Sequence, residues 1–141
     1  MINTLNELSY DDISIGQQES FMIKITESMV EKFSKLSGDL NPLHMDNEFA
    51  ESSSFKKRIV HGMLLASFFS QLIGMKLPGK NALYFSQTLN FRSPCYIDDK
   101  IEIIGEVIEK SDSTKIITIS TSIFNKSKTC LIDGIAKIIV K

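Results

Sequence analysis

The sequence predicts a single α+β domain, in which a curved antiparallel β-sheet wraps around a long central apolar helix. Two observations lead to this fold class. The first half of the 141 residues carries apolar side chains at helical spacing, and the second half, from about residue 81, alternates apolar and polar side chains. No internal repeat, low-complexity run or Pro/Gly/Ser linker divides the chain. We therefore expect residues 1–141 to form one domain.

Composition and charge exclude several classes of protein. The chain is 43% hydrophobic and 23% charged, and 16 Lys+Arg against 17 Asp+Glu give a net charge of -1, which provides no field to hold nucleic acid. Residues 1–12 lack the features of a signal peptide, and no segment has 18 uninterrupted apolar residues. Cys95 and Cys130 match no metal or redox spacing. We expect a cytoplasmic protein that neither spans a membrane nor binds nucleic acid.

The first half of the chain predicts three helices. Residues 28–31 form a capping-box pattern, and Gly38 ends the helix that follows. The Asn41-Pro42 pair then favours an extended or turned backbone, because proline disfavours helical geometry in the residue before it. Asp46 is a candidate N-cap for a short second helix. Residues 63–73 are apolar on nearly every side, which predicts a third helix that is buried all round.

The second half of the chain predicts strands. Polar breaks at residues 111–113 and 125–127 suggest hairpins, so the strands should be antiparallel, and residues 18–26 could add one more. A sheet with one apolar face over one apolar helix gives a hot-dog arrangement. Because a single layer leaves an edge strand exposed, we expect a homodimer. The alternation runs through four segments, residues 83–91, 101–107, 117–123 and 130–140.

The strongest chemical pattern is the segment Ser37-Gly-Asp-Leu-Asn-Pro-Leu-His44. Its Asp39 and His44 are held by a Gly/Asn-Pro loop, and a carboxylate and an imidazole can both transfer protons near neutral pH. Each residue alone has a plainer interpretation. Asp39 could stabilise a turn, and His44 could be a partly buried histidine bonded to a backbone carbonyl. Their shared loop favours an acid/base pair.

With Phe33 before it, this segment resembles the signature of the MaoC-like, (R)-specific enoyl-CoA hydratases, an aromatic residue followed by Ser/Thr-Gly-Asp-x-Asn-Pro-(aliphatic)-His. The resemblance continues through residues 59–67, 77–80 and 84–94. It implies a hot-dog fold and reversible addition of water to trans-2-enoyl thioesters, which gives (3R)-3-hydroxyacyl thioesters. The substrate would be carried on coenzyme A or on acyl carrier protein. The resemblance implies no metal and no organic cofactor.

The resemblance also implies roles for four residues. Asp39 and His44 would hold and activate the water, and Gly62 would offer its backbone N–H to the thioester oxygen. Ser70, two turns further along the central helix, would lie near the acid/base pair. A helix N-terminus, with roughly +0.5 charge, suits the negative charge that develops on that oxygen. Two alternatives stay open: Gly62 as an ordinary helix-start glycine, and Ser70 as a buried serine bonded to its own helix.

Further interpretations concern the other polar residues. We expect His61 to make a structural hydrogen bond that holds the loop before the central helix. A metal site built from His44, Asp46 and His61 is the alternative. The run Lys56-Lys57-Arg58 favours a solvated face over contact with carrier phosphates. The alternative functions are a 3-hydroxyacyl-[acyl-carrier-protein] dehydratase, a hot-dog acyl thioesterase and a non-catalytic acyl-binding subunit.

Overall fold

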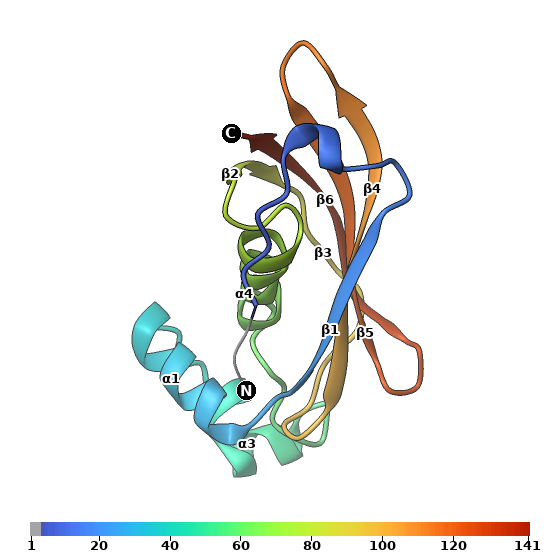
Figure 1. Cartoon of the computed structure of the whole chain (residues 1–141). Coiled ribbons are helices and arrows are strands. Elements are labelled where there is room, and N and C mark those ends of the chain that lie inside the picture. Colours follow the sequence, from blue (N-terminus) through green and yellow to red (C-terminus); the bar gives the residue numbers. More distant parts are fainter. Residues whose placement is uncertain (1–3) are drawn as a thin grey trace.

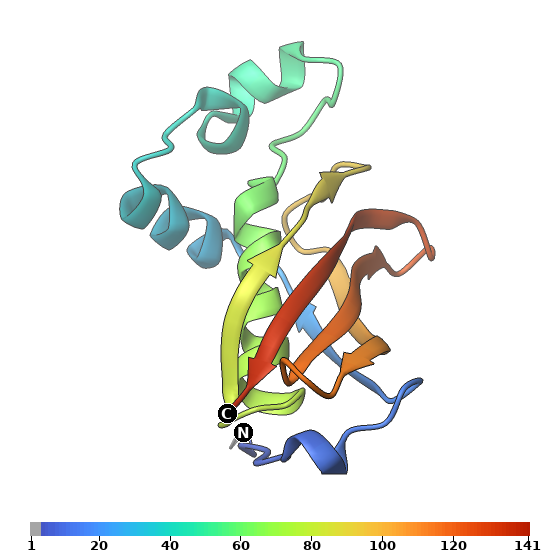
Figure 2. The same ribbon diagram turned by 90° about the horizontal axis from the view of Figure 1, so that it is seen from above.

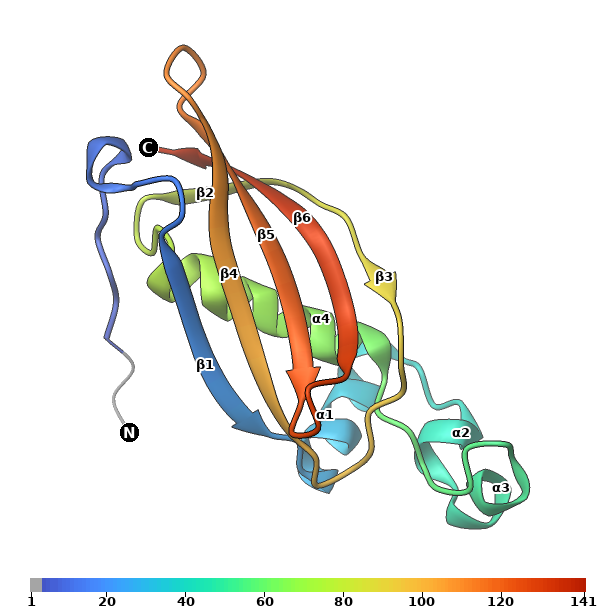
Figure 3. The same ribbon diagram turned by 90° about the vertical axis from the view of Figure 1, so that its right-hand side faces the viewer.

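A six-stranded antiparallel sheet forms the main layer of the computed structural model, which describes residues 4–141. Residues 1–3, part of the stretch that predicted no signal peptide, lie outside the described residues. The strand order is β1-β4-β5-β6-β2, with β3 also paired to β6, and the sheet curves around helix α4 (Figure 3). The hot-dog arrangement is thereby confirmed. The strands are β1 (Gln18–Lys24), β2 (Ala82–Gln87), β3 (Asn90–Phe91), β4 (Lys100–Ser111), β5 (Ile116–Asn125) and β6 (Cys130–Val140).

The apolar side chains of the long strands line the concave face of the sheet. In β4 the buried positions are Ile101, Ile103, Gly105 and Val107, each followed by a more exposed residue, as the period of two predicts. A Cβ on Gly105 would lie 2.8 Å from a methyl group of Leu72. The glycine therefore lets the central helical segment approach the sheet closely.

Helix α4 (Gly62–Gln71) and the π-helical turn η2 (Leu72–Lys76) lie against that concave face (Figure 1). Leu65, Phe69 and Leu72 are at most 2% exposed. The opposite side of the helix is open, with Met63 57% exposed and Ser70 also exposed. The prediction of a helix buried all round is therefore wrong for a single chain, because one sheet covers only one side of it. The other side is available to a further partner.

The strand predicted at residues 83–91 is interrupted. Thr88 and Leu89 separate β2 from β3, and the register of β2 against β6 shifts between Tyr84 and Ser86. A Cβ on Gly134 of β6 would overlap the carbonyl oxygen of Thr88, so the two backbones approach each other closely there. This break turns the chain toward Phe91, which lies beside the start of α4.

Three further helices form a group at one end of the sheet (Figure 2). Helix α1 (Glu27–Ser37) begins at Thr26, whose side chain accepts a hydrogen bond from the N–H of Met29, so the predicted capping box at Ser28 is wrong by two residues. Thr26 has the extended backbone that an N-cap requires. Asp46 caps α3 (Asn47–Ser52), as predicted. The sequence did not predict the short helix α2 (Pro42–Met45), which the fixed φ of proline at its first position favours.

No helix within residues 4–141 is long and apolar enough to cross a membrane.

Candidate active site

The loop after α1 places the Asp39 side chain. Gly38 ends the helix with a left-handed φ of 81°, and the N–H of Asp39 donates to Ser37 Oγ at 3.1 Å. The N–H of Asn41 donates to Asp39 Oδ1 at 3.2 Å, which orients the carboxylate. The Asp39 side chain is 50% exposed. One of its oxygens is therefore occupied by the loop, and Oδ2 is left for another partner.

His44 is held on α2 through both its backbone and its ring. Its N–H donates to the carbonyl of Asn41 at 2.9 Å, and its Nδ1 lies 2.8 Å from the carbonyl oxygen of Ile59. A carbonyl oxygen can only accept, so Nδ1 carries the hydrogen of the neutral ring. The lone pair is then on Nε2. His44 is consequently set up as a proton acceptor at Nε2.

Arg58 connects helix α2, which carries His44, to the first residue of α1. Its side chain is only 7% exposed, and it donates from Nε to the carbonyl of His44 at 2.6 Å and from Nη1 to Glu27 Oε1 at 2.8 Å. The predicted solvated face is therefore wrong for Arg58. Lys57 lies over the ring of Tyr96, 4.7 Å from its centroid, and nothing in the sequence signals either contact.

The two predicted acid/base groups face each other. His44 Nε2 lies 3.9 Å from Asp39 Oδ2, which is longer than a hydrogen bond. With His44 neutral and Asp39 ionised, both atoms are acceptors, so each needs a donor from a third group. One water molecule between them can donate one O–H to each atom. The geometry is thus suited to binding and polarising a single water.

Gly62 lines one cavity together with Asp39 and His44. Asp39, His44 and Gly62 line a cavity of about 220 Å³ together with His61, Met63 and Phe91. Gly62 is the first residue of α4, so its N–H has no intrahelical acceptor and carries the positive end of the helix dipole. The structure therefore brings a hydrogen-bond donor and two proton acceptors to one small cavity.

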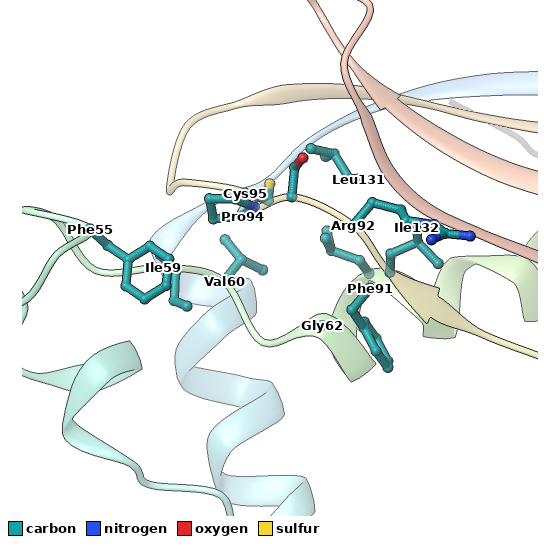
Figure 4. Close-up of a pocket in the computed structure, with 12 residues that line it drawn as sticks. Phe55, Ile59, Val60, Gly62, Phe91, Arg92, Pro94, Cys95, Leu131 and Ile132 are labelled. Atoms are coloured by element: carbon teal, nitrogen blue, oxygen red, sulfur yellow. The ribbon is translucent and has the colours of Figure 1, made fainter.

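Phe91 lines two cavities. A Cβ on Gly62 would lie 2.6 Å from the Phe91 ring, so only glycine allows this contact with the ring in place. Gly62 and Phe91 also line a second, more apolar cavity of about 350 Å³ (Figure 4). The period-two pattern placed Phe91 on a strand and gave no signal of a site. The remaining lining residues of the second cavity are Phe55, Ile59, Val60, Leu65, Arg92, Ser93, Pro94, Cys95, Leu131 and Ile132.

Ser70 is separate from this group. It lies on the exposed side of α4, two turns beyond Gly62, and the described residues that line the 220 Å³ cavity do not include it. The structure thus brings together Asp39, His44 and Gly62, and its single chain leaves Ser70 outside. A role for Ser70 stays a prediction.

The metal alternative fits the observed geometry poorly. Asp39, His44 and His61 offer ligand atoms within 4.8 Å of one another. The two imidazole rings are stacked, however, with centroids 3.9 Å apart and planes 28° apart. Ring lone pairs lie in the ring planes, so those of stacked rings do not converge on one ion as zinc ligands do. Asp46 is engaged as the cap of α3. The arrangement favours proton transfer.

Comparisons with known proteins agree with the fold. The family model described as "MaoC like domain" matches residues 13–127. The (R)-specific enoyl-CoA hydratase of Aeromonas caviae is 37% identical over 127 residues, which cover 90% of this chain and 95% of that protein. The mitochondrial 3-hydroxyacyl-[acyl-carrier-protein] dehydratase of Arabidopsis thaliana is 40% identical over 116 residues, 79% of this chain and 68% of that protein.

Solved structures support the same assignment. The unliganded R-hydratase PhaJ1 of Pseudomonas aeruginosa superposes with a TM-score of 0.92 at 33% identity, over 96% of this chain and 87% of that one. The chain belongs to the MaoC-like domain family.

The protonation of His61 predicts how stability depends on pH. Burial lowers the pKa of His61 below 6.5, the neighbouring His44 acts in the same direction, and the hydrogen bond to Asp39 opposes them. Below about pH 6.5 the unfolded chain binds a proton at His61 that the folded chain resists, so this residue makes the folded state lose stability as the pH falls. Urea unfolding at about pH 7.5 and about pH 5.5 should show a larger loss for wild type than for His61→Gln. Equal losses would contradict a neutral, buried His61.

Proposed function

We propose that this chain is a hydro-lyase that adds water reversibly to trans-2-enoyl-CoA thioesters and gives (3R)-3-hydroxyacyl-CoA products. The observation that carries the proposal is the pair Asp39 Oδ2 and His44 Nε2, 3.9 Å apart, in the cavity that the N-terminus of α4 enters. The likeness to the Aeromonas caviae hydratase supports it. No step of this chemistry needs a metal or an organic cofactor.

In the hydration direction, Asp39 and His44 act on one water. The water donates an O–H to each, its oxygen bonds to C3 of the enoyl group, and one of its protons passes to one of the two bases. The conjugate acid then gives a proton to C2, so the sum is the addition of one H₂O. Such positioned acid/base groups each contribute roughly 10²–10⁴-fold to a rate. Asp39 and His44 are the catalytic residues.

The N-terminus of α4 stabilises the charge that this addition creates. When oxygen adds at C3, electron density moves through C2 to the thioester oxygen, which becomes an enolate oxygen. The N–H of Gly62 is free to donate to it, and the helix dipole adds favourable potential. Loss of one such donor typically costs about 10²–10³-fold in rate. Gly62 is thus the substrate-binding residue of the site.

The second candidate function keeps the chemistry and changes the carrier. The likeness to the Arabidopsis thaliana dehydratase supports an acyl carrier protein substrate as the alternative. The two functions are distinguished by measuring kcat/KM for hydration of the same crotonyl group on coenzyme A and on acyl carrier protein. The higher kcat/KM identifies the preferred carrier.

We infer that the enzyme is a homodimer, with a second copy against β2 and the open side of α4. β2 is an edge of the sheet, and its Leu83 and Phe85 are 50% and 62% exposed. Met63 on α4 and Phe91 on β3 are 57% and 56% exposed. An edge strand beside apolar side chains is a surface that proteins usually cover.

The two free cysteines support the predicted cytoplasmic location. Cys95 is buried, and burial raises the pKa of its thiol to about 12, so it is unreactive. Cys130 is half-buried and also free. Free thiols of this kind are typical of a reducing compartment.

The proposed activity predicts the behaviour of two variants. Hydration of crotonyl-CoA, followed by loss of enoyl absorbance, should have a kcat at least about 10²-fold lower in Asp39→Asn and in His44→Ala, because each loses a proton acceptor. Asp98→Asn is the matched control, since Asp98 is 73% exposed and pairs only loosely with Lys24 at 4.0 Å, and it should keep wild-type activity.

Thiol release from saturated acyl-CoA without hydration would identify a thioesterase instead. A hydration rate that stays at the uncatalysed level in wild type and in both site variants would indicate a non-catalytic subunit.

The inferred dimer predicts the solution mass. Size-exclusion chromatography with light scattering should give about twice the 15.9 kDa chain mass. Leu83→Glu on β2 should shift the protein toward monomer, because it places a charge on the proposed contact. Met22→Glu, at a 61% exposed position on β1 at the other edge of the sheet, should remain dimeric. A wild-type mass of one chain would contradict the dimer.

A further inference from the structure

His61 is a buried polar residue that lines the same cavity as the catalytic pair. It caps α4 without a side-chain bond to that helix and is only 2% exposed. Its ring stacks on His44 at 3.9 Å between centroids and meets the edge of Phe33 at 5.0 Å. The sequence contains only these two histidines. Both therefore lie at the site, one facing the proposed water and the other behind it.

The hydrogen bonds of His61 determine its tautomer. His61 Nε2 lies 3.0 Å from the backbone carbonyl of Asp39, and because a carbonyl oxygen only accepts, Nε2 must carry the hydrogen. The same Nε2 lies 3.2 Å from Ser34 Oγ, which gives its own hydrogen to Met45 Sδ at 2.9 Å and so is free to accept. Nδ1 then holds the lone pair, and it finds no partner within the described chain. His61 and His44 are thus opposite tautomers.

The hydrogen bond from His61 links the loop that carries Asp39, residues 38–41, to a residue far away in the sequence. The other hydrogen bonds of residues 38–41 join positions at most four apart along the chain, such as Gly38 N–H to Ser34 and His44 N–H to Asn41. The bond from His61 to the Asp39 carbonyl spans 22 positions and comes from a buried ring. Residues 37–40 are themselves exposed. The position of Asp39 relative to α4 therefore depends on this bond.

We propose that His61 is a positioning residue of the hydratase site, whose Nε2–H holds the Asp39 backbone so that Asp39 and His44 keep their separation. This inference rests on the proposed function. His61 does not act on the substrate, because its only hydrogen on nitrogen is shared between Asp39 and Ser34. Its contribution is to geometry, and misplacement of a catalytic group by about 1 Å can cost about 10²-fold in rate.

Two substitutions separate the hydrogen bond from the ring. His61→Gln keeps an amide N–H that can reach the Asp39 carbonyl, and His61→Phe keeps a ring against His44 without any donor. We expect His61→Phe to lower kcat for crotonyl-CoA about 10- to 100-fold with KM changed less than about two-fold, and His61→Gln to recover most of that loss. A kcat of His61→Phe within about two-fold of wild type, or equal losses in both variants, would overturn the proposal.

A spectroscopic measurement on the wild-type protein tests the same proposal, with one variant used only to assign the signals. With two imidazoles in the chain, a long-range ¹H–¹⁵N spectrum at neutral pH should show one neutral ring with hydrogen on Nδ1 and one with hydrogen on Nε2. Loss of the Nδ1–H signal in His44→Ala assigns the rings. A neutral His61 with its hydrogen on Nδ1, and therefore none on Nε2, would refute the proposed bond. Because the spectrum needs no turnover, it stands even if wild type fails to hydrate crotonyl-CoA, a result that would refute only the proposed function.

Discussion

The packing of α4 against the concave face of the sheet is the constraint on which the site depends. One side of the helix is buried through Leu65, Phe69 and Leu72, and Gly105 lets it approach the strands closely. With the helix packed there, its N-terminal end lies at the end of the sheet where α1, α2 and α3 gather (Figure 2). Burial of the apolar side of α4 thus positions the N-terminus of this helix, the positive end of its dipole, near the loop after α1 that carries Asp39.

Backbone carbonyls then determine what the polar side chains can do. The carbonyl of Ile59 leaves His44 with a lone pair on Nε2, and the carbonyl of Asp39 takes the Nε2–H of His61. The two imidazoles are stacked within one cluster, and burial disfavours a proton on His61. His44 Nε2 and Asp39 Oδ2 lie 3.9 Å apart, and one water molecule can donate a hydrogen to each. Water is also the reactant that the proposed chemistry needs.

The residues that the sequence predicted well are those with local signals. Alternation along β4, β5 and β6 indicated the sheet, and the Gly-Asp-x-Asn-Pro-x-His pattern placed Asp39 and His44 in one short segment, although His44 lies on helix α2. The residues it predicted poorly act across long separations. Arg58 is buried because Glu27, 31 positions away, accepts from it, and a run of three cations gives no hint of that partner. For Ser70, helical spacing predicts its position along α4. It does not predict which residues of neighbouring elements the side chain contacts.

The central claim is that one water, held between Asp39 and His44, reaches the substrate from one side only, since Gly62 orients the thioester. Chiral analysis of the 3-hydroxybutyryl-CoA formed from crotonyl-CoA tests this most directly. We expect a single enantiomer, because water bound at a single place attacks a single face of the double bond, and the likeness to (R)-specific enoyl-CoA hydratases predicts that it is the (3R) product. A mixture of both enantiomers, or the (3S) product, would contradict the account.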